Sequence, residues 1–223
     1  MFKIETHLHT RYASSCSRQD EKQIVDAYLA AGYHGVVLTD HYHRNTKWFC
    51  FSEKPDLTAF LEGYQKVKEE GQRRGLRVYR GAEVRFDENP NDYLVYGFSD
   101  ALLAEPEKVF SMGVQRFSKL ARMDGALLIQ AHPYRLSPYG NCQPAPAAYL
   151  DGVEVFNGNQ VLDNRNAEAL AFAQSDSRLL QLSGTDCHNP EEIGASGILL
   201  PVLPQDDKAF VQMLKDREYS LLC

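Results

Sequence analysis

Short apolar segments alternate with helical patterns along most of this 223-residue chain. The apolar segments have the length of buried strands and cover residues 2–8, 35–39, 76–84, 93–98, 126–131, 152–156, 179–183 and 197–202. Helical patterns cover residues 20–31, 57–74, 106–123, 160–174 and 206–216. Strands that alternate with helices predict an α/β fold, with a parallel sheet whose crossover helices cover both faces.

The first predicted helix carries signals for its start and its end. Ser17 and Asp20 have the spacing of a capping box, and Gly32 follows the last apolar position. Pro106 stands where the first turn of a later helix is predicted, a position that tolerates proline. These signals support the helix assignments.

Length and composition are those of one folded domain, predicted to span residues 1–223. Hydrophobic residues make up 43% and charged residues 24% of the chain, which excludes a disordered protein. The net charge of -6 weighs against a protein that binds nucleic acid tightly through its phosphates. A small anionic substrate, including a nucleotide or short oligonucleotide, remains open.

The N-terminal residues lack the apolar region of a signal peptide, and no apolar run has the length of a membrane span. We therefore expect a cytoplasmic protein. The cysteines are five, an odd number without CxxC spacing, so they indicate reduced thiols and neither a disulfide framework nor a cysteine-based zinc site.

Histidines and acids gather where the predicted strands end. Only His34, of seven histidines, lies elsewhere. The strand-end residues are His7, His9, Asp40, His41, His43, Glu83, His132, Asp186 and His188. Because the carboxyl ends of parallel strands meet at one face of a barrel, we expect these side chains to lie close together.

The spacing of these residues suits metal binding. His7 and His9 are two apart in a strand and point to the same side, and Asp186 and His188 repeat the pattern. Imidazole with carboxylate suits zinc, manganese or iron, whereas calcium prefers oxygen ligands alone. A carboxylate such as Glu83 can bridge two ions.

Each segment by itself also fits a structural role. Asp40 and His41 could cap a helix, Glu83 could pair in a buried salt bridge, and His132 could belong to a turn stiffened by Pro133. Five separate strand ends would have to carry ligand residues by accident, which favours a metal site.

The ordered segments HLHT, LTDH, GAE, AHP and GTDCH resemble the motifs of the PHP (polymerase and histidinol phosphatase) family over most of the chain. The resemblance implies a distorted TIM-like (β/α)7 barrel, one to three divalent ions (Mn, Fe or Zn) and hydrolysis of phosphate esters. It also implies that His7, His9, Glu83 and Asp186 hold one ion, Glu83 and His132 a second, and His41 with His188 a third. Asp40 shares the strand-end position and is a further candidate ligand.

Two segments depart from the family pattern. Residues 13–17 read Ala-Ser-Ser-Cys-Ser where the family often has His or Asp, and residues 94–98 lack the His that often follows the glutamate motif. The third site would therefore lack a ligand, and the second site would be weak. Cys16 could replace one as a thiolate, or it could be a buried structural cysteine.

The implied mechanism uses water activated by the metal ions to attack phosphorus. His41 or His188 would assist proton transfer to the leaving oxygen, and Arg85 and Arg135 would grip the phosphate. A surface salt bridge is the alternative role for each arginine. Arg11 and Asn157 are weaker candidates for phosphate contact.

Two other functions remain open. One is an amidohydrolase-like enzyme that cleaves C–N or C–O bonds, and Glu83 weighs against it because such enzymes commonly use a strand-end lysine. The other is a non-catalytic, metal-stabilised binding module. The expected partner is a small phosphorylated substrate, such as histidinol phosphate, a sugar phosphate or a nucleotide. Loop aromatic residues that could form its pocket are Trp48, Phe49, Phe51, Tyr134 and Tyr139.

Overall fold

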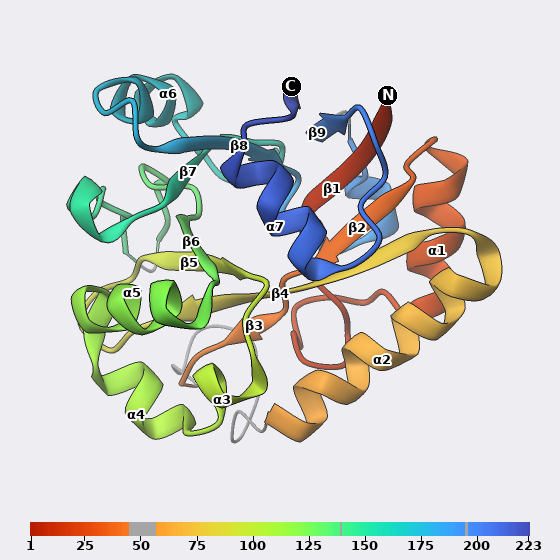
Figure 1. Cartoon of the computed structure of the whole chain (residues 1–223), viewed down its shortest axis with the longest axis horizontal. Helices are drawn as coiled ribbons and strands as arrows, with labels where there is room; N and C mark the ends of the chain where they lie inside the picture. Colours follow the sequence, from red (N-terminus) through yellow and green to blue (C-terminus); the bar gives the residue numbers. More distant parts are fainter. Residues whose placement is uncertain (45–56, 139, 195) are drawn as a thin grey trace.

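A computed structural model describes residues 1–44, 57–138, 140–194 and 196–223 (Figure 1). The strands are β1 (Phe2–Leu8), β2 (Gly35–Leu38), β3 (His41–Tyr42), β4 (Arg77–Arg85), β5 (Asp92–Tyr96), β6 (Leu127–Gln130), β7 (Gly152–Asn157), β8 (Leu180–Gly184), β9 (Gly197–Leu200) and β10 (Ser220–Leu222). The α-helices are α1 (Glu21–Ala30), α2 (Leu57–Arg74), α3 (Asp100–Leu103), α4 (Pro106–Ser111), α5 (Gly113–Asp124), α6 (Asn166–Gln174) and α7 (Asp207–Lys215). The 3-10 helices are η1 (Ala147–Tyr149) and η2 (Pro190–Glu192).

The strands form one mixed sheet that curls into a barrel. Their order is β10-β9-β1-β2-β4-β5-β6-β7-β8, and β3 pairs with β4. A parallel bridge between Leu8 and Cys187 brings the end of β1 to the residues that follow β8, which closes the wall. Within the described residues, β1, β2, β4, β5, β6, β7 and β8 thus make the predicted seven-stranded α/β barrel.

The prediction of a wholly parallel sheet is wrong. β5 runs antiparallel to both β4 and β6, because only a short turn joins β4 to β5 and such a turn reverses the chain. β9 pairs antiparallel with β1 and with β10. The connection from β6 to β7 carries η1 in place of an α-helix. The barrel is therefore a distorted one.

Two predicted helices have different bounds in the structure. The helix predicted over residues 106–123 is divided at Gly113, whose φ is +72° and whose position leaves no room for a Cβ beside the carboxylate of Glu88. Glu88 accepts the amide of Val114 at 2.8 Å and so caps α5. The helix predicted over residues 160–174 begins only at Asn166, after Arg165 with a φ of 49°.

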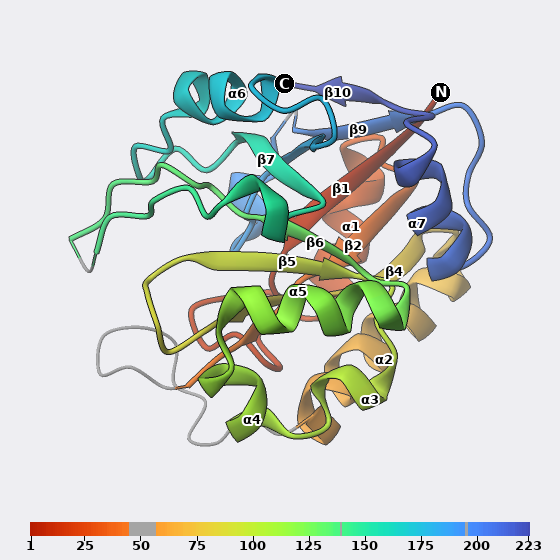
Figure 2. The same cartoon turned by 60° about the vertical axis from the view of Figure 1, so that its left-hand side comes forward.

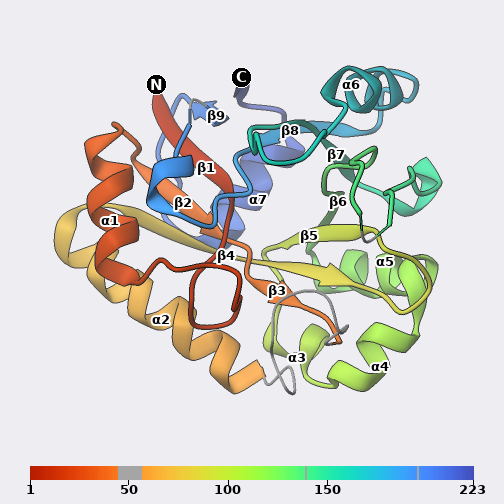
Figure 3. The same ribbon diagram turned by 180° about the vertical axis from the view of Figure 1, so that it is seen from behind.

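The cap of α1 also differs from the prediction. Asp20 and Gln23 form the capping box, with Asp20 as the N-cap. The Ser17 hydroxyl instead lies 2.9 Å from the carbonyl oxygens of both His9 and His188. It therefore ties together two of the loops that carry candidate ligands. Figure 3 shows α1 and α2 side by side along β2 and β4.

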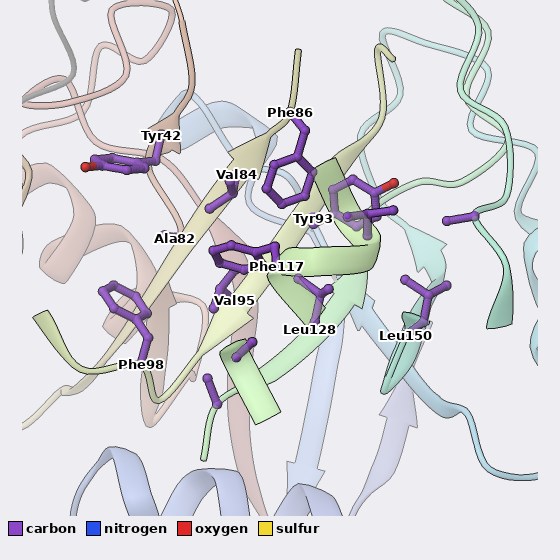
Figure 4. Packing of buried hydrophobic residues seen from close by; sticks show 14 of the residues in the cluster. Tyr42, Ala82, Val84, Phe86, Tyr93, Val95, Phe98, Phe117, Leu128 and Leu150 are labelled. Atoms are coloured by element: carbon purple, nitrogen blue, oxygen red, sulfur yellow. The ribbon is translucent and has the colours of Figure 1, made fainter. Parts of the chain in front are cut away.

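The hydrophobic core lies on both sides of the barrel wall. Outside it, α3, α4 and α5 gather beside β5 and β6 (Figure 2), and Phe117 packs against Phe86 with ring centroids 5.1 Å apart (Figure 4). Inside it, a second cluster includes Leu94 and the stacked rings of Tyr79 and Phe210, the latter from α7. α7 packs where β4 begins, so the apolar core fills that end and polar side chains occupy the other.

The oxidation state of the cysteines differs in part from the prediction that all of them are reduced thiols. Cys142, Cys187 and Cys223 are free, but Cys16 is disulfide-bonded. A disulfide sulfur is not a thiolate, so Cys16 in this state does not replace a missing metal ligand. Among the described residues, every helix is too short or too polar to cross a membrane.

Candidate metal centre

A bulge in β1 aims His7 and His9 at the end of the barrel. The register between β1 and β2 shifts between Glu5 and Leu8, which frees backbone amides from the ladder. The buried carboxylate of Glu5 accepts the amides of Thr6 at 2.9 Å and His7 at 3.0 Å. Both histidine rings are fully buried as a result of this arrangement.

Two other candidate ligands have strained backbones. His132 follows β6 with a φ of 27°, and Asp186 follows β8 with a φ of 55°. Positive φ angles are uncommon outside glycine and cost on the order of 1–3 kcal/mol each. The strain turns both side chains back over the barrel end, where they meet Glu83 of β4 and His7.

The first group of ligand atoms has the spacing of a coordination shell. His7 Nε2 lies 3.3 Å from Glu83 Oε1 and 3.3 Å from Asp186 Oδ1. His9 Nε2 lies 3.1 Å from Asp186 Oδ1 and 3.5 Å from Glu83 Oε2. Ligands on one tetrahedral ion at about 2.0–2.1 Å lie about 3.3 Å apart. His7 Nε2 is buried and has no hydrogen-bond partner among the described residues, which fits an atom whose role is to bind a metal ion.

Two further groups of ligand atoms surround this one. His132 Nε2 lies 3.2 Å from Glu83 Oε1, and with His7 they form one group. His9, His41 and His188 form the other, with the rings of His9 and His188 stacked at 4.2 Å. His41 Nδ1 lies 2.6 Å from Glu83 Oε2. The two oxygens of Glu83 therefore contact residues of all three groups.

Electrostatics favour the metal-binding forms of Glu83, Asp186 and His9, but not of His7, whose pKa burial lowers and the carboxylates of Asp186, Glu154 and Glu83 raise well above its ordinary value. Burial alone would raise the pKa of Glu83, but the neighbouring His41 and His7 hold it well below the usual range. In the same way Arg135 and His7 hold the pKa of Asp186 well below the usual range. Burial, together with the charges of His188 and His41, lowers the pKa of His9 well below its ordinary value. Anionic carboxylates and a neutral imidazole are the forms that bind zinc, manganese or iron.

Asp40 has other partners. Its oxygens accept the amide and hydroxyl of Thr10 and the hydroxyl of Ser14, each at 2.6 Å. Ser14 Oγ lies 3.1 Å from His9 Nδ1 and accepts the amide of His41 at 2.9 Å. In the structure Asp40 thus holds the loop that orients His9, and burial raises the pKa of Asp40 to about 6.

Both candidate arginines line a cavity of about 480 Å³ above the ligands. Arg135 donates from Nε to Asn164 at 2.6 Å and from a terminal nitrogen to Asp186 at 2.5 Å. Arg85 binds both oxygens of Asp92 at 2.7 Å. These carboxylates fix the two guanidinium groups on opposite strand ends of the cavity.

The remaining candidates lie away from the cavity or outside the described residues. Arg11 is half exposed and lies 3.6 Å from Asp20. His43 bonds the carbonyl of Arg44 through Nδ1. Tyr134 packs edge-on against Phe172. Trp48, Phe49, Phe51 and Tyr139 lie outside the described residues.

Several buried polar residues were missed by the sequence analysis. Glu154 of β7 lies 2.9 Å from His7 Nδ1, and Ser14 and Asn164 hold His9 and Arg135 respectively. Glu154 was detectable, since it is a single acid within the apolar segment Gly152–Asn157. Ser14 and Asn164 lie in loops, where polar residues are common and give no such signal.

The structure resembles solved proteins of several kinds. A two-domain protein from Bacteroides vulgatus with a predicted PHP-like metal-dependent phosphoesterase matches with a TM-score of 0.70 and 15% identity, over 99% of this chain and 64% of that one. A lesion-specific endonuclease from Pyrococcus furiosus matches with a TM-score of 0.64 and 12% identity, over 99% and 57%. An amidohydrolase from Chromobacterium violaceum, solved with sulfate and no metal, matches with a TM-score of 0.59 and 14% identity, over 98% of both chains.

These likenesses establish the fold, which is that of PHP-like and amidohydrolase-like barrels. The chain spans less than two thirds of the Bacteroides and Pyrococcus proteins. No model of a known protein family and no curated protein matches the sequence. Because one fold hosts different reactions, the activity has to be argued from the site.

Proposed function

We propose that this protein hydrolyses phosphate esters of small molecules with the help of bound divalent ions. The observation that carries the proposal is the convergence of His7, His9, Glu83 and Asp186 with ligand atoms 3.1–3.5 Å apart, beneath a cavity lined by two arginines. The likeness to a PHP-like phosphoesterase supports it.

The residues divide into holders of metal and holders of substrate. His7, His9, Glu83 and Asp186 would hold a first ion, and His132, His41 and His188 extend the site for one or two more. Ions bound there would neutralise phosphoryl charge and lower the pKa of a water molecule that attacks phosphorus. The donor set suits Zn, Mn or Fe.

Arg135 and Arg85 would bind the phosphoryl oxygens. Each already has two nitrogens held by a partner, so its orientation toward the cavity costs little further entropy on substrate binding. His188 and His41 line the cavity, and one of them that is not held by metal would pass a proton to the leaving oxygen.

The cavity sets the size of the substrate. A volume of about 480 Å³ suits a small molecule, and part of the lining is apolar, at Pro90, Pro138, Val161 and Leu162. A phosphate monoester with a partly apolar leaving group, such as a nucleotide or amino-alcohol phosphate, fits this combination.

The proposal is tested by a substrate panel on protein stripped of metal and reloaded with Mn or Zn. We expect turnover of aryl phosphates, dependent on the metal, and none of lactones or amides. Turnover of lactones or amides alone would support the amidohydrolase-like function that the Chromobacterium protein's name suggests. Full phosphatase activity after complete metal removal would contradict the mechanism, and metal binding without any turnover would favour a binding module.

A further inference from the structure

Glu154 is a buried carboxylate on which three hydrogen-bond donors converge. It lies on β7 with 1% of its surface exposed. Its Oε1 lies 2.9 Å from His7 Nδ1, while Oε2 accepts the backbone amide of His132 at 3.0 Å and the side-chain amide of Asn157 at 2.9 Å. One side chain thus contacts two candidate metal ligands from two different strands.

We propose that Glu154 is a positioning residue that fixes the tautomer of His7, and the inference rests on the proposed metal site. An ionised carboxylate only accepts hydrogen bonds, so the contact at 2.9 Å places the imidazole proton on Nδ1. The lone pair then lies on Nε2, the atom 3.3 Å from both Glu83 and Asp186. A carboxylate behind a metal-bound histidine orients the ring and raises its basicity.

The same carboxylate holds the strained ligand His132. The amide of His132 would have no partner in the ladder at a φ of 27°, and Glu154 Oε2 accepts it. Asn157 continues the contacts to Asn164, whose Oδ1 accepts Nε of Arg135. Glu154 therefore links two candidate ligands to the residues that hold Arg135, in addition to the direct contact between Arg135 and Asp186.

Substitution of Glu154 by glutamine separates positioning from packing. Glutamine has nearly the same shape as glutamate, but it has one oxygen where glutamate has two. That oxygen can accept hydrogen bonds either from His7 or from His132 and Asn157, but not from both sides. With that oxygen facing the amides of His132 and Asn157, its NH₂ faces His7 Nδ1 and requires a lone pair there. The ring proton then moves to Nε2, which removes the atom that would bind metal.

Glu5 offers a matched control, because it is equally buried and lies beside the same histidine. Its Oε1 accepts the backbone amides of Thr6, His7 and Thr185, and its Oε2 accepts from the hydroxyl of Tyr28. In Glu5→Gln the amide oxygen keeps the three backbone contacts, and the NH₂ faces a hydroxyl that can accept. The hydrogen bond from His7 to Glu5 comes from the backbone amide and not from the ring.

The experiment measures zinc affinity of wild type, Glu154→Gln and Glu5→Gln by competition with a chromophoric chelator. We expect the tightest site to weaken by about 10–100-fold in Glu154→Gln and by less than about 2-fold in Glu5→Gln. Circular dichroism checks that each variant is folded. Wild-type zinc affinity in a folded Glu154→Gln variant would overturn the inference.

Imidazole nitrogen shifts of His7 by NMR test the inference in metal-free protein, at a pH high enough to leave the ring neutral, because nearby carboxylates raise the pKa of His7 well above its ordinary value. We expect the single proton of the neutral ring on Nδ1 in wild type and in Glu5→Gln, and on Nε2 in Glu154→Gln. A neutral wild-type ring with its proton on Nε2 would overturn the inference even if phosphate esters are hydrolysed. Zinc binding without hydrolysis would contradict the proposed function alone and leave the tautomer result to decide the role of Glu154.

Discussion

Arg135 and Arg122 lie at opposite ends of the barrel and are held by different kinds of partner. Arg135 follows β6 and is bound by the side chains of Asn164 and Asp186, with 11% of its side chain exposed. Arg122 precedes β6 and donates to Asp151 and to the carbonyls of Ala148 and Leu150, with 42% exposed. Arg122 donates hydrogen bonds to backbone carbonyls of the segment before β7, whereas Arg135 contacts a candidate metal ligand inside a cavity.

Positive φ angles differ between the two ends in the same way. Arg217 has a φ of 57° just after α7, where the amides of Arg217 and Glu218 bond the carbonyls of Leu214 and Met213. That is a Schellman helix end, a local device usually built with glycine. His132 and Asp186 have no such local reason for their strain. The strained backbone of His132 and Asp186 orients candidate ligands, whereas the strained backbone of Arg217 ends a helix.

Glu83→Gln should lower activity more than any other substitution considered, and Asp151→Asn should leave activity almost unchanged. Glu83 contacts candidate ligands on four strands or loops, so its loss should lower kcat/KM by on the order of 10³-fold and reduce bound metal. Among the described residues, the side chain of Asp151 accepts from Arg122 and from the amide of Leu128, both away from the candidate ligands. Kinetics and elemental analysis of both variants check this. Equal losses would remove the distinction between the two ends.

Arg135→Ala should lower kcat by roughly 10²-fold and keep the metal content, since a guanidinium binds phosphate but not a cation. Arg122→Ala should instead lower the free energy of unfolding by about 1–2 kcal/mol and leave kcat unchanged. Steady-state kinetics, metal analysis and urea unfolding measure all three quantities. A loss of kcat in Arg122→Ala would show that the two arginines are not functionally distinct.

Metal at about 100 times its dissociation constant should stabilise the fold by about 2.7 kcal/mol, which raises Tm by roughly 5–10 °C for a chain of this size. Glu83→Gln should lose most of that increase, and Arg122→Ala should keep it while starting from a lower Tm. Differential scanning calorimetry with and without a chelator checks the prediction. A Tm that is indifferent to metal would contradict the proposed ion sites.

Arg85→Ala should have a smaller effect than Arg135→Ala. Both nitrogens that Arg85 offers to Asp92 are engaged, and Asp92 lies 3.9 Å from His132 Nε2 on the outer side of the ligands. We expect an increase in KM of about 10-fold with little change in kcat, as for a group that binds ground-state phosphate. A fall in kcat larger than that of Arg135→Ala would reverse the assignment.

Arg217→Gly and Arg217→Ala give the smallest expected difference. Both variants lose the hydrogen bonds from the guanidinium to the carbonyls of Ser177, Arg178 and Leu179. Only glycine also relieves the positive φ, so the glycine variant should be more stable than the alanine variant by about 1 kcal/mol. Urea unfolding measures the difference, and phosphatase activity should match wild type in both.

The order of the longer strands and helices was predictable from the sequence, because burial imposes a period on each element, whereas the short elements β3, α3 and β10 were not predicted. α2 was predicted with its bounds, Leu57–Arg74. The grouping of histidines and acids at strand ends was predictable too, since any barrel gathers those ends. Which of these residues hold metal remains a prediction, although the structure brings His7, His9, Glu83 and Asp186 together.

Tertiary structure decided what local pattern leaves open. The break in the helix at Gly113 beside Glu88 and the partners of Asp40 depend on groups distant in sequence. Glu154 and His7 are 147 positions apart, and their contact exists only because β7 and β1 enter the same barrel. Residue type and spacing determine which chemistry is possible, but the distances that make an oxygen a hydrogen-bond partner are set by packing of the whole chain.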